Sequence, residues 1–535
     1  MSIAKPAEFH WTWLDALIAA SLTLAAAWIR LRALQLVPTL TDETDEVQFA
    51  LRIVREHFFP AVSIDTYNGP LLHYLLAPGL WLDGPAWPRL LVMLLGALTV
   101  GATYFLGASL AATHFAASRR VAANARLAGL LAAALLAVSF VPVVVNSHIT
   151  WSNATTPFWT TLALLALAEA HRRARPRLLV AAGALAGLAL QTHPTAFVIL
   201  LGAAAWIAVV RRAWLRTRWP WLALGAAVLL TSNLIIYNIV SAGGSAEGAA
   251  RRGYAFTGGS SLAEYGENMR GFVGLAYQMV GSTFISTLAA DAATSAMRHP
   301  VVIAYAIVAL AALLYTARRA GLPLACWLAA FFIFPYFNRA YDSHISARYM
   351  AALLPPTFAA MGILLAAGVG MLARQGAAAP SSRRGLRLAV GAGAALLTLA
   401  LIAYPITRLD TYYFYELADG RNNARMWQIM DAVRRPGQLG APVYLDRGLR
   451  DLKLDAGGHV YKALQMLLDL DHTPRLNPPV EELADAPVGA YLVLTDARRD
   501  ALASRLTLAP LELASPPAPA APGGYWVYRI AGTAR

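Results

Sequence analysis

Long apolar runs separated by short polar segments dominate the first 405 residues of the chain. About 20 apolar residues suffice to cross the hydrocarbon of a bilayer as a helix. The pattern predicts a polytopic α-helical membrane region over residues 1–405 with about eleven transmembrane helices, some of them short. The predicted spans are residues 14–36, 89–113, 127–146, 156–170, 178–191, 195–210, 219–240, 301–316, 321–338, 350–373 and 386–404.

The pattern changes after residue 405, where short strand-like runs alternate with helical patterns. Such alternation is typical of a small α/β unit with some parallel strand pairing. Residues 406–535 are therefore predicted to form a C-terminal soluble α/β domain. Its strands are predicted at 441–447, 490–496 and 524–530, and its helices at 422–435, 459–471 and 496–506.

Clusters of basic residues lie in every second connection between the predicted spans. Cytoplasmic loops are enriched in Lys and Arg, so this alternation predicts a cytoplasmic N-terminus and an extracytoplasmic C-terminal domain in a multi-pass plasma membrane protein. The net charge of +14 then indicates membrane orientation and not nucleic-acid binding. The basic clusters are Arg119 with Arg120 and Arg126, residues 171–177, residues 211–218, Arg318 with Arg319, and residues 381–387.

Two predicted external loops stand out, the first at 37–88 and a long one at 241–300. The first loop carries four carboxylates within five positions, Asp42, Glu43, Asp45 and Glu46. Three interpretations are open: a solvated loop, capping of the helix that follows, or catalysis. Mutual repulsion among the four carboxylates predicts that at least one pKa is raised. Residues 67–82 read as an interfacial segment against the bilayer, which suits a substrate with a lipid tail.

Five segments together resemble the GT-C glycosyltransferases, in particular protein O-mannosyltransferases and the aminoarabinose transferases of lipid A. Their order and spacing cover roughly residues 10–405. The resemblance implies a GT-C-like membrane fold and transfer of a sugar from a polyprenyl-phosphate-linked donor, on the outer face, with inversion. The segments are "TDETDEVQFALRIVRE", "NGPLLHYLLAP", "WPRLLVMLLGALTVGATYFLGASL", "PVVVNSHITWSNATTPFWTTLALLALAEA" and "ARYMAALLPP".

The resemblance also suggests catalytic residues in the first external loop. The family carries an Asp-Glu pair followed by an aromatic residue and an alanine, and Asp45, Glu46, Phe49 and Ala50 match that spacing. It implies that Asp45 is the general base, which takes the proton of the acceptor nucleophile. Glu46 is expected to orient the acceptor or a metal, or to cap the helix.

The phosphate of the donor calls for positive charge. The chain has three lysines, Lys5, Lys453 and Lys462, and none lies in the predicted external loops of the membrane region. The segment "SHISARY" supplies the predicted donor-phosphate ligands, which are Arg348, Tyr349 and His344. The planar guanidinium of Arg donates two hydrogen bonds to a phosphate, although Arg348 could also be an interface residue.

Further polar and aromatic residues of the external loops are candidates for substrate binding. Asn153 stands where relatives often carry Asp, which weakens a metal site shared by two loops; a divalent cation stays an open alternative. The candidates are Asp42, Glu43, His73, His148, Trp151, Asn153 and His193.

Two other functions compete with the transferase. A transporter would place ionisable residues at mid-membrane, often with internal repeats, whereas here they lie mainly at the outer ends and the sequence has no evident repeat. A polymerase or ligase of lipid-linked oligosaccharides would use a large external loop rich in Arg and His, and 241–300 contains Arg251, Arg252, Arg270 and His299. The acceptor of a transferase could be a lipid, a glycan or a protein. The Arg- and Ala-rich composition suggests a bacterium.

Overall fold

A computed structural model of the chain describes most of its 535 residues. The described residues are 9–82, 84–251, 262–282, 298–337, 347–372, 381–417, 423–455, 458–471, 483–511, 513 and 524–533. The predicted ligand His344 and the central parts of the 241–300 loop, with Arg252, lie outside them.

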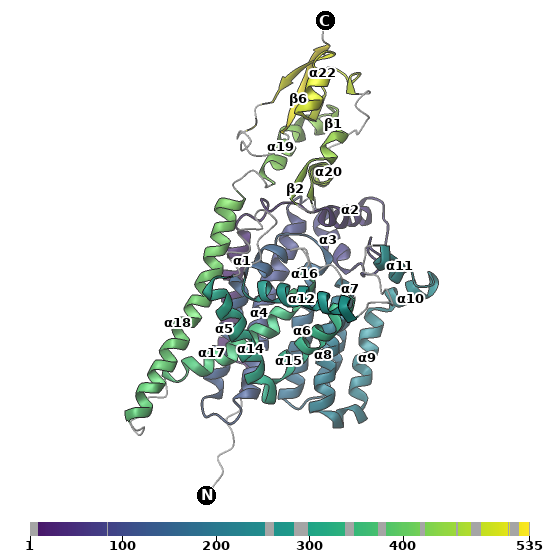
Figure 1. The fold of residues 1–535 in the computed structure, drawn as a ribbon. Helices are drawn as coiled ribbons and strands as arrows, with labels where there is room; N and C mark the ends of the chain where they lie inside the picture. Colours follow the sequence, from purple (N-terminus) through teal and green to yellow (C-terminus); the bar gives the residue numbers. More distant parts are fainter. Residues whose placement is uncertain are drawn as a thin grey trace.

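A helix occupies each of the eleven predicted spans, and further helices lie between them (Figure 1). The helices that match the spans are α1 (Trp13–Leu31), α4 (Trp87–His114), α5 (Val121–Val138), α6 (Thr156–Arg172), α7 (Leu178–Thr192), α8 (Thr195–Val210), α9 (Arg218–Leu230) with α10 (Ser232–Val240), α14 (Pro300–Ala320), α15 (Leu322–Phe337), α17 (Leu354–Val369) and α18 (Ser381–Thr411). The helices between them include α2 (Thr41–Arg55), α3 (Leu71–Trp81), α11 (Gly244–Arg251), α12 (Leu262–Val280) and the short α16 (Ala347–Met350).

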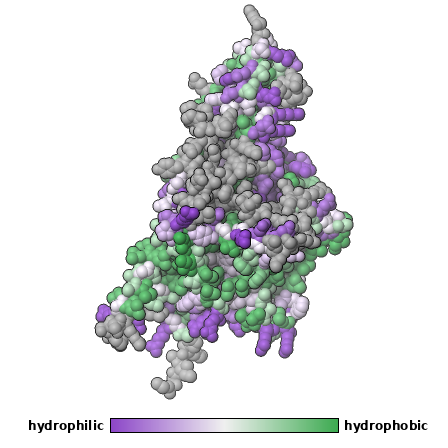
Figure 2. All heavy atoms as spheres, in the orientation of Figure 1, coloured by the Kyte–Doolittle hydropathy of each residue, from purple (hydrophilic) through white to green (hydrophobic). Residues whose placement is uncertain are grey.

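Length and apolarity mark this as a multi-pass membrane protein. Among the described residues, six helices are long and apolar enough to cross a bilayer, and the broken pair α9–α10, bent by 61°, would be a seventh. Helices α7, α8 and α15 are shorter. The total of eleven spans stays a prediction. Figure 2 shows an apolar band across the visible face of the helical part, with polar residues at the end away from the C-terminal sheet.

Close backbone contacts hold the centre of the helical part together. Helix α4 packs against α1, α5, α6 and α17. A Cβ at Gly129 of α5 would come within 2.5 Å of the Tyr104 carbonyl of α4, and one at Gly362 of α17 within 2.3 Å of the Ala128 carbonyl. Glycine at these positions lets the helices approach, as is common between membrane helices. The result is a rigid support for the loops at the helix ends.

The C-terminal residues form a sheet with the strand order β1-β4-β6-β5, where β1 is Val443–Leu445, β4 is Tyr491–Thr495, β6 is Tyr525–Thr533 and β5 is Leu506–Pro510. The three predicted strands coincide with β1, β4 and β6, and β1 pairs in parallel with β4 while β6 is antiparallel to β4 and β5. A separate ribbon pairs β2 (Lys453–Asp455) with β3 (Gly458–His459). Helix α22 (Asp496–Leu502) follows β4.

Two helices join this sheet to the membrane part. Helices α19 (Ala424–Gln438) and α20 (Val460–Leu470) pack on each other, and α20 also packs on α2. Figure 1 shows this C-terminal part at the end of the helical bundle where α2 and α3 lie. The assignment of residues 406–535 as a separate extracytoplasmic domain stays a prediction.

Candidate active site

The four clustered carboxylates lie inside helix α2 and not in the loop before it. The helix begins at Thr41, and no side chain caps its N-terminus. Residues three apart share a helix face, so Asp42 and Asp45 form one pair and Glu43 and Glu46 another. The glutamates are buried, whereas the side chains of Asp42 and Asp45 are 40% and 21% exposed. Only the aspartates are accessible to a substrate.

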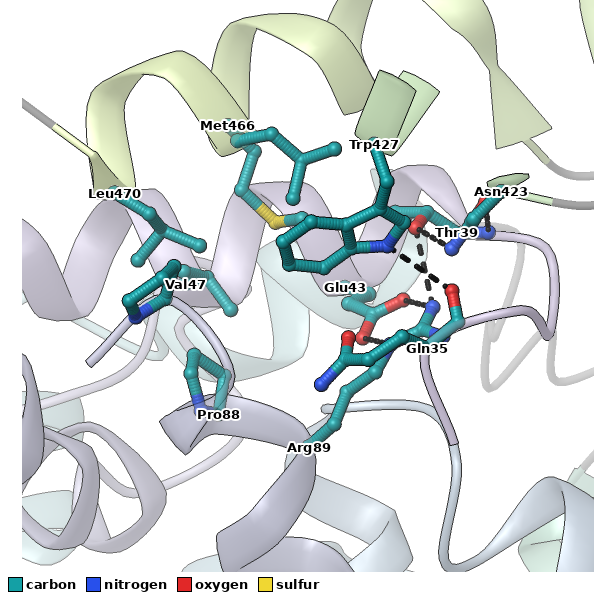
Figure 3. Close-up of a pocket in the computed structure, with 12 residues that line it drawn as sticks. Gln35, Thr39, Glu43, Val47, Pro88, Arg89, Asn423, Trp427, Met466 and Leu470 are labelled. Carbon is teal, nitrogen blue, oxygen red and sulfur yellow. Dashed lines mark hydrogen bonds and ion pairs between the residues drawn. The ribbon is translucent and has the colours of Figure 1, made fainter. Parts of the chain in front are cut away.

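Glu43 forms a buried ion pair with Arg89, which sequence reasoning did not single out. Arg89 of α4 donates from Nε and Nη2 to the two carboxylate oxygens of Glu43 at 2.9 and 2.8 Å. Its Nη1 donates to the carbonyls of Leu34 and Val37 at 2.9 and 2.8 Å. Figure 3 shows the pair beneath the C-terminal helices. The Glu43–Arg89 pair therefore fixes α2 and residues 34–39 onto α4.

The same region receives the C-terminal part. Asn423 donates to the Val37 carbonyl at 2.7 Å and accepts from the Thr39 N–H at 3.0 Å, and Trp427 donates to the Gln35 carbonyl at 3.1 Å. Figure 3 shows these side chains around the small cavity that Glu43 and Arg89 line. The chain that leads into α2 is thus held from both sides.

Glu46 lies against His73 of α3, with Oε2 and Nε2 2.6 Å apart. Both side chains are buried, and His73 is fully so. Burial alone would raise the pKa of Glu46, but His73 and Ser152 lower it below its usual range. Glu46 is therefore not a carboxylate whose pKa is raised, as repulsion within the cluster predicts for at least one of the four. His73 does not reach the accessible surface, because it is fully buried. Its predicted role in substrate binding stays a prediction.

The two glutamates clamp the second loop, here residues 146–155 between α5 and α6, on either side of Trp151. The Thr150 N–H donates to Glu43 Oε1 at 3.1 Å, and the Ser152 N–H donates to Glu46 Oε1 at 3.2 Å. Both bonds are buried. The position of Trp151 is therefore set by α2.

Trp151 in turn supports Arg348. The Arg348 guanidinium stacks over the Trp151 ring at 4.2 Å, within the range of a cation–π contact. Its Nη2 donates to Asp42 Oδ2 at 2.9 Å and lies 2.8 Å from the Tyr349 hydroxyl. The His193 ring lies 5.1 Å from the Tyr349 ring. The structure thus brings these five predicted site residues together from four separate segments.

Several buried polar atoms of the second loop have no hydrogen-bonding partner among the described residues. They are Thr150 Oγ1, Trp151 Nε1 and Asn153 Oδ1. Buried polar groups are normally satisfied, so this concentration beside Arg348 is unusual. It is the kind of surface that a polar ligand completes.

Two further histidines of the site, besides His73, are buried. His193 is 7% exposed, and its burial, with the nearby Arg348 charge, lowers its pKa to about 3. His148 is fully buried; its ring nitrogens lie 2.5 Å from the Val143 carbonyl and 3.1 Å from the Arg32 carbonyl. Burial lowers the pKa of His148 to about 4. His148 contacts backbone, and its role in substrate binding stays a prediction.

Asp45 meets a lysine from the C-terminal part. Lys462 of α20 donates to Asp45 Oδ1 at 2.8 Å. Gln48 of α2 donates to Asp469 Oδ2 at 3.3 Å, and Arg55 donates to the Asp469 carbonyl. Helix α20 therefore covers the accessible face of α2. Within the described ranges no group of three His, Cys, Asp or Glu side chains is arranged to hold a metal ion.

The comparisons confirm the predicted resemblance to the GT-C membrane glycosyltransferases at the level of the fold. The family described as dolichyl-phosphate-mannose-protein mannosyltransferase matches residues 70–237. Two crystal structures of ArnT from Cupriavidus metallidurans are similar in fold. The one bound to undecaprenyl phosphate is 15% identical, with a TM-score of 0.52 and coverage of 95% of this chain and 97% of that one. The apo structure is 16% identical, with a TM-score of 0.51 and coverage of 96% and 98%. No curated protein matches the chain.

Proposed function

We propose that the protein is an inverting glycosyltransferase of a bacterial plasma membrane. It would move a sugar from a polyprenyl-phosphate-linked donor to a lipid, glycan or protein acceptor on the outer face. The observation that carries the proposal is the contact set of Arg348, which stacks on Trp151 and pairs with Asp42 beside the unsatisfied polar atoms of residues 150–153. The undecaprenyl phosphate held by the similar ArnT structure supports a lipid phosphate as the ligand.

Arg348 is assigned to the donor phosphate. Sugar transfer breaks the bond between the anomeric carbon and a phosphate oxygen, so negative charge grows on that phosphate as it leaves with its lipid. A guanidinium fixed by stacking and by a carboxylate is already oriented for this charge. Asp42, whose oxygen accepts from Arg348, would act as the positioning residue for that guanidinium.

Asp45 is assigned as the general base. It lies three residues after Asp42 and so on the same face of α2. Its carboxylate would accept the proton of the acceptor as the acceptor oxygen or nitrogen attacks the anomeric carbon from the side opposite the phosphate. Glu43 and Glu46 are buried and engaged with Arg89 and His73, which leaves Asp45 as the accessible carboxylate not paired with Arg348.

The test compares single site variants in a deletion strain of the source bacterium, with envelope glycans analysed by mass spectrometry. Asp45→Asn should fail to restore the modification that the deletion strain lacks, because base catalysis contributes about 10²–10⁴-fold. The purified variant should still bind undecaprenyl phosphate. Arg348→Ala should lose that binding. Full activity of Asp45→Asn with an inactive Asp42→Asn would transfer the base to Asp42.

The same analysis separates the competing functions. If the protein is a transferase, its inactivation leaves the glycan without one defined sugar. A polymerase or ligase would change chain length or attachment of a whole glycan, and a transporter would leave its substrate unmodified inside the cell. Either outcome would contradict the proposed reaction.

A further inference from the structure

A second polar cavity opens at the opposite end of the helical part, far from the acidic helix α2. Its volume is about 420 Å³, within the usual range for ligand sites. Helix ends line it: α4 contributes Ala112 and Thr113, α5 begins there at Val121, and α6 ends there at Arg172. Phe9 and His10, which precede α1, line it as well. By the positive-inside prediction this end is cytoplasmic.

Four arginines line the cavity, namely Arg172, Arg173, Arg175 and Arg211. Among the described residues, the one carboxylate that pairs with any of them is Glu169, which contacts Arg172 and Arg173. Four guanidinium groups against one carboxylate leave an excess of three positive charges around one cavity.

The arginines differ in how fully they are engaged. Arg172 is held in place: it donates to both Glu169 oxygens at 2.8 Å and to the Phe9 carbonyl at 2.7 Å. Arg173 donates to Glu169 from Nε alone, at 2.5 Å. The Arg175 guanidinium has no hydrogen-bonding partner in the described part of the chain, and it is exposed. Arg173 and Arg175 therefore retain donors for a ligand.

The walls around these donors are fixed in advance. The Arg172 guanidinium stacks over Phe9 at 5.4 Å and over Trp11 at 5.7 Å, and the Trp11 N–H donates to Glu169 at 3.3 Å. Arg211 donates to His171 Nδ1 at 3.1 Å and to the His171 carbonyl at 2.9 Å. The cavity is thus built from cross-linked segments and not from loose surface arginines.

We propose that this cavity binds the phosphate headgroup of an anionic phospholipid. Guanidinium groups match phosphate oxygens in geometry and charge, and basic pockets between membrane helices on the cytoplasmic side suit such headgroups. A phospholipid is favoured over free inorganic phosphate as the ligand because the cavity lies at the ends of apolar helices. Val209 and Val210, 77% and 42% exposed, directly precede Arg211 on α8 and offer an apolar path for an acyl chain.

The test is native mass spectrometry of the full chain released from mixed micelles that contain phosphatidylglycerol and phosphatidylcholine. The wild type should retain phosphatidylglycerol selectively. The double variant Arg173→Ala/Arg175→Ala should lower its occupancy about tenfold, because charge-assisted hydrogen bonds are lost. Arg172 is left intact because it ties the N-terminal segment to Glu169.

The matched control is Arg212→Ala/Arg216→Ala, which removes the same charge from two exposed arginines that do not line the cavity. The control should bind as the wild type does, and thermal unfolding should verify that both variants fold. Equal loss in both variants, or none in the cavity variant, would overturn the site. A thermal shift with inorganic phosphate that disappears in the cavity variant, without retained phosphatidylglycerol, would overturn the lipid assignment.

Discussion

The Glu43–Arg89 pair offers the sharpest test of how the site is held together. The two side chains are 1% and 5% exposed and share two hydrogen bonds. Removing one partner of a buried ion pair leaves the other charge uncompensated, which typically costs about 3–5 kcal/mol. Glu43→Gln should lie at the lower end of that range, because an amide oxygen can still accept from Arg89 Nε. Arg89→Met should lie at the upper end, because it also removes the donor to the Leu34 carbonyl and one of the two donors to the Val37 carbonyl.

The double variant Glu43→Gln/Arg89→Met separates pairing from individual roles. With both charges gone it should be less destabilised than the two single variants added together, by about 2 kcal/mol or more. The measurement is unfolding of purified protein by SDS in mixed micelles, followed by tryptophan fluorescence. Additive effects would mean that the two residues do not act as a pair, and the account of α2 as fixed onto α4 would fail.

Three further predictions concern the neighbours of α2. Trp151→Leu should weaken binding of undecaprenyl phosphate about 2- to 30-fold in native mass spectrometry, since a cation–π contact with Arg348 contributes about 0.5–2 kcal/mol; Trp151→Phe should retain most of it. His193 has a folded pKa of about 3 against about 6.5 unfolded, so its contribution to stability should be complete above pH 6.5 and decline as the pH falls toward 3, by at most about 1.4 kcal/mol per unit. His193→Gln should flatten that part of the unfolding profile. Lys462→Met should reduce transfer only a few-fold, because the Lys462–Asp45 pair is partly exposed, whereas Lys462→Glu should reduce it much further.

The helical part was predictable because membrane helices carry their signal locally. Apolar runs near 20 residues need no partner to be recognised, and each predicted span coincides with a helix. Boundaries were less accurate: the run predicted at 127–146 is helix α5 only to Val138, followed by a π-helical turn at Val141–Val145. Apolarity continues through that break, so composition alone does not reveal it.

Grouping of the site residues was also partly predictable. Asp42, Trp151, His193, Arg348 and Tyr349 were each expected at the outer ends of helices, and the structure brings them into contact. What the sequence did not reveal was that the two glutamates of α2 are buried while the two aspartates are partly exposed. That difference depends on which face of α2 meets α4 and the second loop, and four adjacent acidic residues carry no apolar pattern to indicate it.

Two cations of the site were missed for different reasons. Arg89 stands at the start of an apolar run, where a basic residue is commonly an interface anchor, and nothing local indicates a carboxylate 46 residues earlier. Lys462 lies in the C-terminal part, 417 residues from Asp45. The absence of lysine from the predicted external loops of the membrane region directed the prediction to Arg348 as the phosphate ligand.

The contact of Lys462 with Asp45 changes how the C-terminal part should be regarded. Helix α20 contacts α2 through Lys462 and through Asp469, which accepts from Gln48 and Arg55. An acceptor must reach Asp45 if that residue is the base, and α20 covers the same face. Because the ion pair is partly exposed, its contribution is about 1 kcal/mol or less, small enough for a substrate to displace. Removing residues 441–535, which takes away α20 but keeps Asn423 and Trp427, should therefore expose Asp45 and relax discrimination among acceptors, measured as a wider range of modified glycans, whereas unchanged specificity would confine this part to a structural role.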